Sequence, residues 1–292
     1  MKTLLRLATV TGVALAPSCV WAQPVPPVRT DQVRVVYQEP LDPKHQAIRA
    51  EMQQRRILET LAGLLGAFRL PRELTLDMRG CNGRETAWYG NGTAVFCYEY
   101  AELIQRHAPK VATPGGVSRA DAIVAAVIDT VLHEAGHGII DLLEIPVLGR
   151  EEDAADFFSI YWMLQFPPDD ARRLIEGIAF NMGSEARQDF SETPRPQKYA
   201  GPHGSNAQRH YTVLCLAYAA NAAMFNNGRP AGLPEWRAQN CWDDWGMLRR
   251  AFTKLIMPHV DEAKLREAIA QARFGWSPLS TATETFDKPP LE

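Results

Sequence analysis

Residues 118–158 read SRADAIVAAVIDTVLHEAGHGIIDLLEIPVLGREEDAADFF, and this stretch decides the fold. From Ser118, a good N-cap residue, to about Leu143 the pattern is continuously helical and strongly apolar. A helix of this composition is expected to lie buried through the middle of the protein. Pro146 breaks it, and a second helix is expected from about Glu151.

Before this stretch the sequence predicts a small sheet with one helix, and after it only helices. Alternating and β-branched segments predict strands at residues 33–37, 73–78, 85–89 and 93–100, with Asn91-Gly92 in the hairpin turn. One helix is expected over residues 43–68, and further helices at 169–190, 205–225, near 241 and at 261–273. We therefore predict an α+β fold with an N-terminal α/β half at about residues 31–145 and a helical C-terminal half at about 146–275.

The N-terminus has the layout of a secretory signal peptide. Lys2 and Arg6 precede an apolar run that ends at Leu15, and Val20-Trp21-Ala22 forms a small-x-small cleavage site. The run is too short to span a membrane. We predict a signal peptide over residues 1–22 and a secreted or periplasmic mature chain of residues 23–292.

Charge and composition exclude two classes of partner. The formal net charge is −3, and loss of Lys2 and Arg6 with the signal takes it to −5. No Lys/Arg block stands out, so we expect no nucleic-acid partner. The mature chain has no second long apolar segment, so we expect no membrane span.

Four cysteines remain after the signal peptide: Cys81, Cys97, Cys215 and Cys241. An even number in an exported chain predicts disulfides, and the local pairing Cys81–Cys97 with Cys215–Cys241 is preferred among the three that are possible. The alternative is four buried free thiols. Neither pair has the CxxC spacing of a structural zinc site.

His133-Glu134-Ala135-Gly136-His137 is an HExxH motif. Residues four apart share a helix face, so both imidazoles can reach one metal ion, zinc by preference. Glu134, next to the first histidine, can contact a water on that ion and take its proton. Two histidines and a glutamate would be costly to bury in an apolar helix without such a partner.

A third ligand must follow the motif, and several carboxylates do. Glu152 lies fifteen residues after His137, and Asp156 one turn later could accept a hydrogen bond from the outer nitrogen of a ligand histidine. Glu151 and Asp153 lack such a partner four residues on. Asp141 and Glu144 also follow the motif. Glu152 is preferred, and the others stay open.

HExxH followed by Glu-x-x-x-Asp on the next helix resembles the gluzincin, or thermolysin-like, group of zincin metallopeptidases. The resemblance implies a zincin-like fold in which His133, His137 and Glu152 bind zinc, Glu134 is the base and Asp156 supports a ligand histidine. The stretch 133–158 looks closer still to a bacterial family labelled "putative metallopeptidase", of otherwise undescribed function. That likeness extends over most of the mature chain.

The resemblance also implies a peptide or protein substrate. In zincins a strand at the rim of the cleft pairs with extended substrate, and residues 93–100 hold that place in the chain order. They could equally form an ordinary internal strand. A donor for the oxyanion is needed as well, and His203, on a loop before a helix, is the preferred candidate. His210 and Tyr211 are alternatives, and Arg209 could pair with a carboxylate of the site.

The prediction is a secreted zinc hydrolase that cleaves peptide bonds. The alternative is a non-catalytic zinc-binding envelope protein that acts through a protein partner, against which the intact Glu134 argues. A soluble helical protein with a coincidental HExxH is the third reading, and the Glu152/Asp156 pair argues against it.

Overall fold

The computed structural model describes residues 32–191, 200–225 and 228–275. The predicted signal peptide therefore lies outside the described residues. The strands are β1 (Val33–Tyr37), β2 (Leu74–Arg79), β3 (Ala87–Gly90) and β4 (Thr93–Cys97). The main helices are α1 (Gln46–Arg55), α2 (Ile57–Leu65), α3 (Tyr98–His107), α4 (Arg119–Leu142), α5 (Glu151–Met163), α6 (Pro168–Ser191), α8 (Asn206–Ala220), α9 (Glu235–Ala238), α10 (Cys241–Ala251) and α11 (Glu262–Gln271). Short 3₁₀ turns lie at Pro43–His45, Ala222–Met224 and Met257–His259, and a π-helical turn at Phe252–Ile256. The predicted α+β fold, with a small N-terminal mixed sheet and a mainly helical remainder, is confirmed.

The four strands form one sheet in the order β1-β2-β4-β3. β1, β2 and β4 are parallel, and β3 runs antiparallel to β4. The β3–β4 hairpin turns at Asn91 and Gly92, whose φ values are 50° and 77°. A two-residue hairpin turn requires this pair of left-handed residues. β3 is thus an edge strand. The suggestion that residues 93–100 form the rim is wrong, because β4 lies between β2 and β3.

Two predicted elements differ from the structure. The helix expected over residues 43–68 is divided at Arg56, whose φ of 54° ends α1 and redirects the chain into α2. The strand expected to reach Tyr100 ends at Cys97, and α3 begins at Tyr98. The pattern of apolar residues continues across both positions, so it does not reveal where the helix is divided or where the strand ends. Tertiary packing decides both points.

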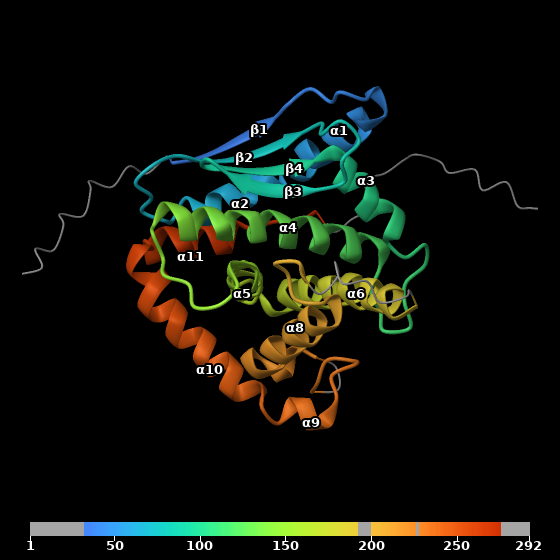
Figure 1. The fold of residues 1–292 in the computed structure, drawn as a ribbon, viewed down its shortest axis with the longest axis vertical. Coiled ribbons are helices and arrows are strands. Elements are labelled where there is room, and N and C mark those ends of the chain that lie inside the picture. Colours follow the sequence, from blue (N-terminus) through green and yellow to red (C-terminus); the bar gives the residue numbers. More distant parts are fainter. Residues whose placement is uncertain (1–31, 192–199, 226–227, 276–292) are drawn as a thin grey trace, which may run out of the picture.

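Helix α4 is the centre of the molecule. Ser118 is its N-cap, as predicted, and forms a capping box with Asp121. Strands β2, β3 and β4 pack on one side of α4, and α5 and α6 on the other (Figure 1). Within the described part of the chain α4 is the one helix long and apolar enough to cross a membrane, and 67% of its most apolar window is buried inside the protein. Its hydrophobicity therefore serves the core.

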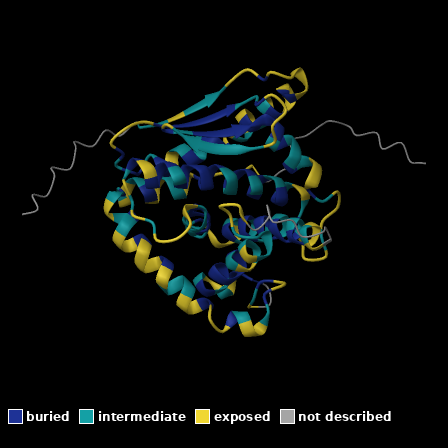
Figure 2. Ribbon diagram, in the orientation of Figure 1, coloured by how far each residue is buried: buried dark blue, intermediate teal, exposed yellow. Residues whose placement is uncertain are grey.

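One hydrophobic cluster runs through the whole described chain, from Ile48 in α1 to Phe274 after α11. Figure 2 shows this core as buried residues along the sheet and α4, with exposed residues on the outer face of α10. Near one end of the core, Phe68, Phe158, Trp162 and Phe252 pack ring against ring. These rings join α5 to the chain after α2 and to the chain after α10.

Two disulfides join the predicted pairs, Cys81 with Cys97 and Cys215 with Cys241. The first ties β4 to the loop after β2, and the second ties α8 to the start of α10. Disulfides persist in oxidising compartments, so the pairing is typical of a protein that folds outside the reducing cytosol.

Candidate metal centre

Helices α4 and α5 bring three potential ligand atoms together. Nε2 of His133 lies 3.1 Å from Oε2 of Glu152, and Nε2 of His137 lies 3.3 Å from the same oxygen. The two Nε2 atoms are 3.3 Å apart. A tetrahedral ion with bonds of about 2.0–2.1 Å holds its ligand atoms roughly 3.3 Å from one another. The triangle therefore fits a tetrahedral metal ion.

Both imidazoles are held by a carboxylate on the outer nitrogen. Nδ1 of His133 lies 2.8 Å from Asp156, and Nδ1 of His137 lies 2.7 Å from Glu151. Such bonds fix the tautomer, so each ring turns Nε2 toward Glu152. The place of Asp156 agrees with the prediction. Glu151, an alternative ligand by sequence, instead contacts the outer nitrogen of His137.

The other carboxylates weighed as ligands have different neighbours. Asp153 accepts a hydrogen bond from Arg150 at 2.9 Å, and Asp141 accepts one from the hydroxyl of Tyr89 at 2.6 Å. Of the carboxylates after the motif, Glu152 is the one that contacts both histidines.

A glycine inside the motif allows the two helices to approach. A Cβ atom at Gly136 would lie 3.2 Å from Cβ of Phe158 and 3.3 Å from Cα of Ala155. Both atoms belong to the body of α5 and cannot rotate away. Gly136 thus permits the close α4–α5 contact that places Glu152 beside His133 and His137.

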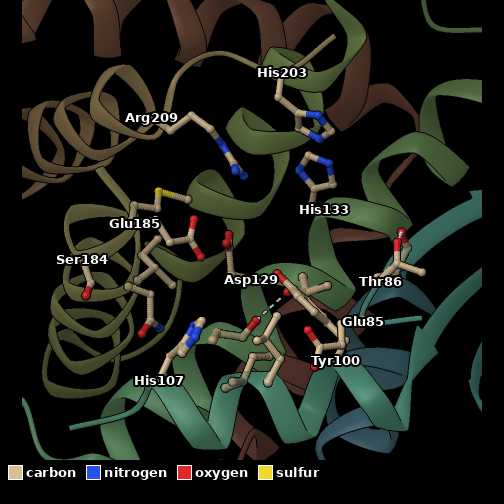
Figure 3. A pocket seen from close by; sticks show the side chains of 18 of the residues that line it. Glu85, Thr86, Tyr100, His107, Asp129, His133, Ser184, Glu185, His203 and Arg209 are labelled. Atoms are coloured by element: carbon tan, nitrogen blue, oxygen red, sulfur yellow. Dashed lines mark hydrogen bonds between the residues drawn. The ribbon is translucent and has the colours of Figure 1, made fainter. Parts of the chain in front are cut away.

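His203 and Arg209 approach this cluster from the C-terminal helical part. Nε2 of His203 lies 2.8 Å from Oε2 of Glu152, and its ring stacks on that of His133 with centroids 5.9 Å apart. Arg209 holds Asp156 with two hydrogen bonds, from Nε at 2.7 Å and Nη2 at 2.8 Å. Figure 3 shows His203, His133 and Arg209 at one end of a cavity.

The two alternatives to His203 lie elsewhere. Nδ1 of His210 is 2.8 Å from the carbonyl of Ala179, so this side chain is engaged with α6. Tyr211 is 40% exposed and lines a separate cavity with Trp236. The suggested pairing of Arg209 with a carboxylate of the site is confirmed.

The charges of the cluster depend on one another. Burial lowers the pKa of His133, but the hydrogen bonds to Asp156 and Glu152 outweigh burial and raise its pKa to about 10. Burial also disfavours ionised Asp156, yet the bonds from His133 and Arg209 hold its pKa well below the usual range. A metal-free His133 therefore carries a proton between two carboxylates, and a cation can take the place of that proton.

Glu134 is buried beside these groups, with 9% of its surface exposed. Burial raises its pKa above the ordinary 4.5, against the opposing charges of His133 and His137. It lines both cavities that flank the cluster. A buried carboxylate whose pKa is raised toward neutrality is suited to exchange a proton.

The raised pKa of Glu134 has a consequence for stability. A carboxyl with a raised folded pKa stabilises the fold below its unfolded pKa, and this stabilisation is lost as pH rises through the folded value. In chelator-treated protein, Glu134→Gln should therefore be more stable than wild type at pH 8, with the difference vanishing near pH 4. Urea denaturation at both pH values measures this, and equal stability at pH 8 would contradict it.

Two cavities lie on either side of the cluster. One, of about 410 Å³, is bordered by His133, and the other, of about 460 Å³, by His137. They share Ala87, Glu134 and His203. Ala87 begins β3, so the edge strand borders both cavities.

Sequence reasoning missed two carboxylates that line the cavity beside His133, Asp129 and Glu185. For Asp129 a signal existed, because it lies four residues before His133 and so shares its helix face. For Glu185 there was no signal in the sequence, because α6 and α4 are brought together by tertiary packing. The two helices approach closely at Gly177. There a Cβ atom would lie within 2.6 Å of Cβ of Ala125 and the carbonyl of Asp121.

A family model described as "Putative metallopeptidase" matches residues 37–256, which include every residue of the cluster. No curated protein and no solved structure matches the chain. The matched segment is 220 of the 292 residues. The histidine–glutamate cluster is what an enzyme of that description needs, and the chain belongs to this metallopeptidase family.

Proposed function

We propose that this protein is a zinc-dependent peptidase of the gluzincin type, with a zincin-like fold, that acts in the periplasm or outside the cell. His133, His137 and Glu152 are the zinc ligands, and Glu134 is the general base. The observation that carries the proposal is the triangle of two Nε2 atoms and one carboxylate oxygen, 3.1–3.3 Å apart, beside a buried glutamate. The predicted signal peptide and the two disulfides support export.

Zinc, when bound, supplies a Lewis acid for the scissile carbonyl and makes a nearby water more acidic. Glu134 accepts the proton of the attacking water and passes it to the amine that leaves. Asp156 and Glu151 keep the two imidazoles in position through their outer nitrogens. Arg209, bonded twice to Asp156, holds that carboxylate in place.

His203 is suited to donate a hydrogen bond to the oxyanion that develops on the carbonyl. Its Nε2 reaches the cluster at Glu152, while half of its side chain remains exposed to the opening. Burial lowers its pKa, and the charge of Glu152 opposes this. A neutral imidazole with a proton on Nε2 is a hydrogen-bond donor, which is what an oxyanion needs.

An extended peptide fits along β3. The free edge of a β-strand offers unpaired N–H and C=O groups to a segment of substrate, and β3 passes both cavities at Ala87. Side chains on either side of the scissile bond would then enter the two cavities. The alternative hypothesis, a non-catalytic zinc protein, does not account for Glu134. This glutamate is not one of the proposed ligands, and its burial disfavours its ionised form.

Removing the third ligand tests the metal assignment. Glu152→Ala should purify without zinc, whereas wild type should hold about one zinc ion per chain, because two imidazoles alone bind weakly. Asp153→Asn is the matched control, since Asp153 lies next in α5 and pairs with Arg150. Metal analysis of the three proteins measures the effect, and full zinc in Glu152→Ala would refute this ligand set.

His203→Ala separates the oxyanion role from a role as ligand. The variant should keep its zinc and lose activity by about 10²–10³-fold in kcat, the usual effect of deleting an oxyanion donor. Metal analysis and peptide hydrolysis are measured on the same preparation. A loss of zinc together with activity would make His203 a fourth ligand.

A further inference from the structure

The two cavities beside the cluster differ in their chemistry. The one of about 410 Å³ lies between α3, α4 and α6, and we call it the acidic pocket. Its apolar wall consists of Leu103, Ile104, Ile178 and Met182. Glu85 and His107 line it farther from Arg209, and Figure 3 shows the carboxylates of Asp129 and Glu185 pointing into the space beside Arg209.

The charge of Arg209 is already matched at this end of the pocket. Arg209 is the nearest guanidinium, and its two hydrogen bonds go to Asp156. Asp129 and Glu185 both interact electrostatically with Arg209, which lowers their pKa values, but burial is the larger influence and raises them. Asp129 and Glu185 thus add two carboxylates that Arg209, and His107 in the case of Glu185, attract without a hydrogen bond.

The two extra carboxylates are only partly satisfied. Asp129 accepts a hydrogen bond of 2.7 Å from the hydroxyl of Ser159. Among the residues that the structure describes, no hydrogen bond or ion pair reaches Glu185. Glu185 is only half-buried, so its carboxylate is open to the pocket, where an incoming cation is screened less by water than at the outer surface and can pair with it.

An organic cation suits this pocket better than a metal ion. Within the described part of the chain, Asp129 and Glu185 do not belong to any group of three ligand atoms within 4.8 Å of one another. The apolar wall matches the methylene stem of a Lys or Arg side chain, whose charged end can reach past it. Asp129 lies one helical turn before His133, about 6 Å along α4, which places the negative charge deeper in the pocket than the cluster.

We propose that the acidic pocket binds a Lys or Arg side chain of the substrate beside the scissile bond, with Glu185 and Asp129 as its counter-ions. The enzyme would then cleave peptides next to basic residues. This inference rests on the proposed peptidase function and names its substrate class. The cavity beside His137, lined by Trp88, Tyr89 and Pro202, would take the side chain across the bond.

Cleavage-site mapping with matched variants tests the proposal. Zinc-loaded wild type digests an unfolded protein, and mass spectrometry locates the cuts, which should lie beside Lys or Arg. Kinetics then compare two peptides that differ only in Lys or norleucine at that position. Glu185→Gln should lower the Lys-to-norleucine ratio of kcat/KM at least tenfold, and Asp129→Asn should lower it as well. Glu176→Gln is the control, because this half-buried glutamate of α6 pairs with Arg172 outside the pocket.

A binding measurement distinguishes failure of the pocket from failure of the peptidase. Calorimetry with zinc-loaded Glu134→Gln and the same two peptides should show at least tenfold tighter binding of the Lys peptide, and loss of that preference in Glu134→Gln/Glu185→Gln. Cleavage without preference for basic residues, or a preference that survives both pocket substitutions, overturns the pocket and leaves the peptidase standing. If wild type is inactive, a Lys preference in binding supports the pocket while the peptidase fails. Equal binding of both peptides in that case overturns the pocket too.

Discussion

Glu134→Gln is expected to lower kcat for peptide hydrolysis by about 10²–10⁴-fold while the protein keeps one zinc ion per chain. The amide has the shape of the carboxylate but cannot accept the proton of the attacking water, and general bases contribute about that factor. The three ligand atoms are unchanged, so metal binding should persist. Peptide cleavage and metal content are measured on the same purified protein.

A second glutamate near the cluster provides the control. Glu151→Gln changes the carboxylate that contacts Nδ1 of His137 at 2.7 Å, without touching Glu134. It should weaken zinc binding by about 10–100-fold and retain activity at saturating zinc. If Glu134→Gln kept the activity of wild type, water activation by Glu134 would be excluded and the non-catalytic alternative strengthened.

Asp156→Ala is expected to lower the free energy of unfolding by about 3–5 kcal/mol and to weaken zinc binding by about 10–100-fold. The substitution leaves Arg209 buried without its doubly bonded partner and releases Nδ1 of His133. Urea denaturation at pH 7 and zinc titration with a chelator measure the two effects. Asp153→Asn, whose ion pair with Arg150 is exposed, should change stability by less than about 1 kcal/mol.

The stability effect of Asp156 should depend on pH in a defined direction. Its pKa is held below the ordinary 3.8 in the folded chain, so its contribution is present above that value and is lost as pH falls toward the folded pKa. The difference between wild type and Asp156→Ala should therefore be full at pH 7 and smaller at pH 3. A difference that grew on acidification would show that Arg209 is stabilised by other groups.

Much of the fold follows from local patterns that the structure confirms. The apolar run after Ser118 and the Asn91-Gly92 turn specify α4 and the β3–β4 hairpin, and the even number of cysteines indicates disulfides, of which the preferred local pairs form. Each signal acts over a few residues or over one helix face, so neighbours in sequence suffice. The break at Arg56 and the early start of α3 were not predictable in this way, because they depend on what the chain packs against.

Part of the candidate site was likewise predictable from local spacing, and part was not. The spacing of His133 and His137 predicts one helix face for both imidazoles, with Glu134 next to the first, and the spacing of Glu152 and Asp156 predicts a ligand with a supporting carboxylate. Their roles stay predictions until metal and activity are measured. The contact of Glu151 with His137, the pairing of Arg209 with Asp156 and the meeting of Asp129 with Glu185 join separate helices, which no spacing along the chain encodes.

Local sequence patterns were enough to predict an α+β chain with an HExxH helix at its centre, and they favoured Glu152 as third ligand and the local cysteine pairing among three. Tertiary structure alone decided that β3, not β4, forms the edge beside the cluster, and that Glu185 reaches the pocket next to His133. The physical reason is the packing of α4 against α5 at Gly136 and against α6 at Gly177, where missing Cβ atoms allow close approach. Helical periodicity tells which residues share a face, but only the packed core decides which faces meet.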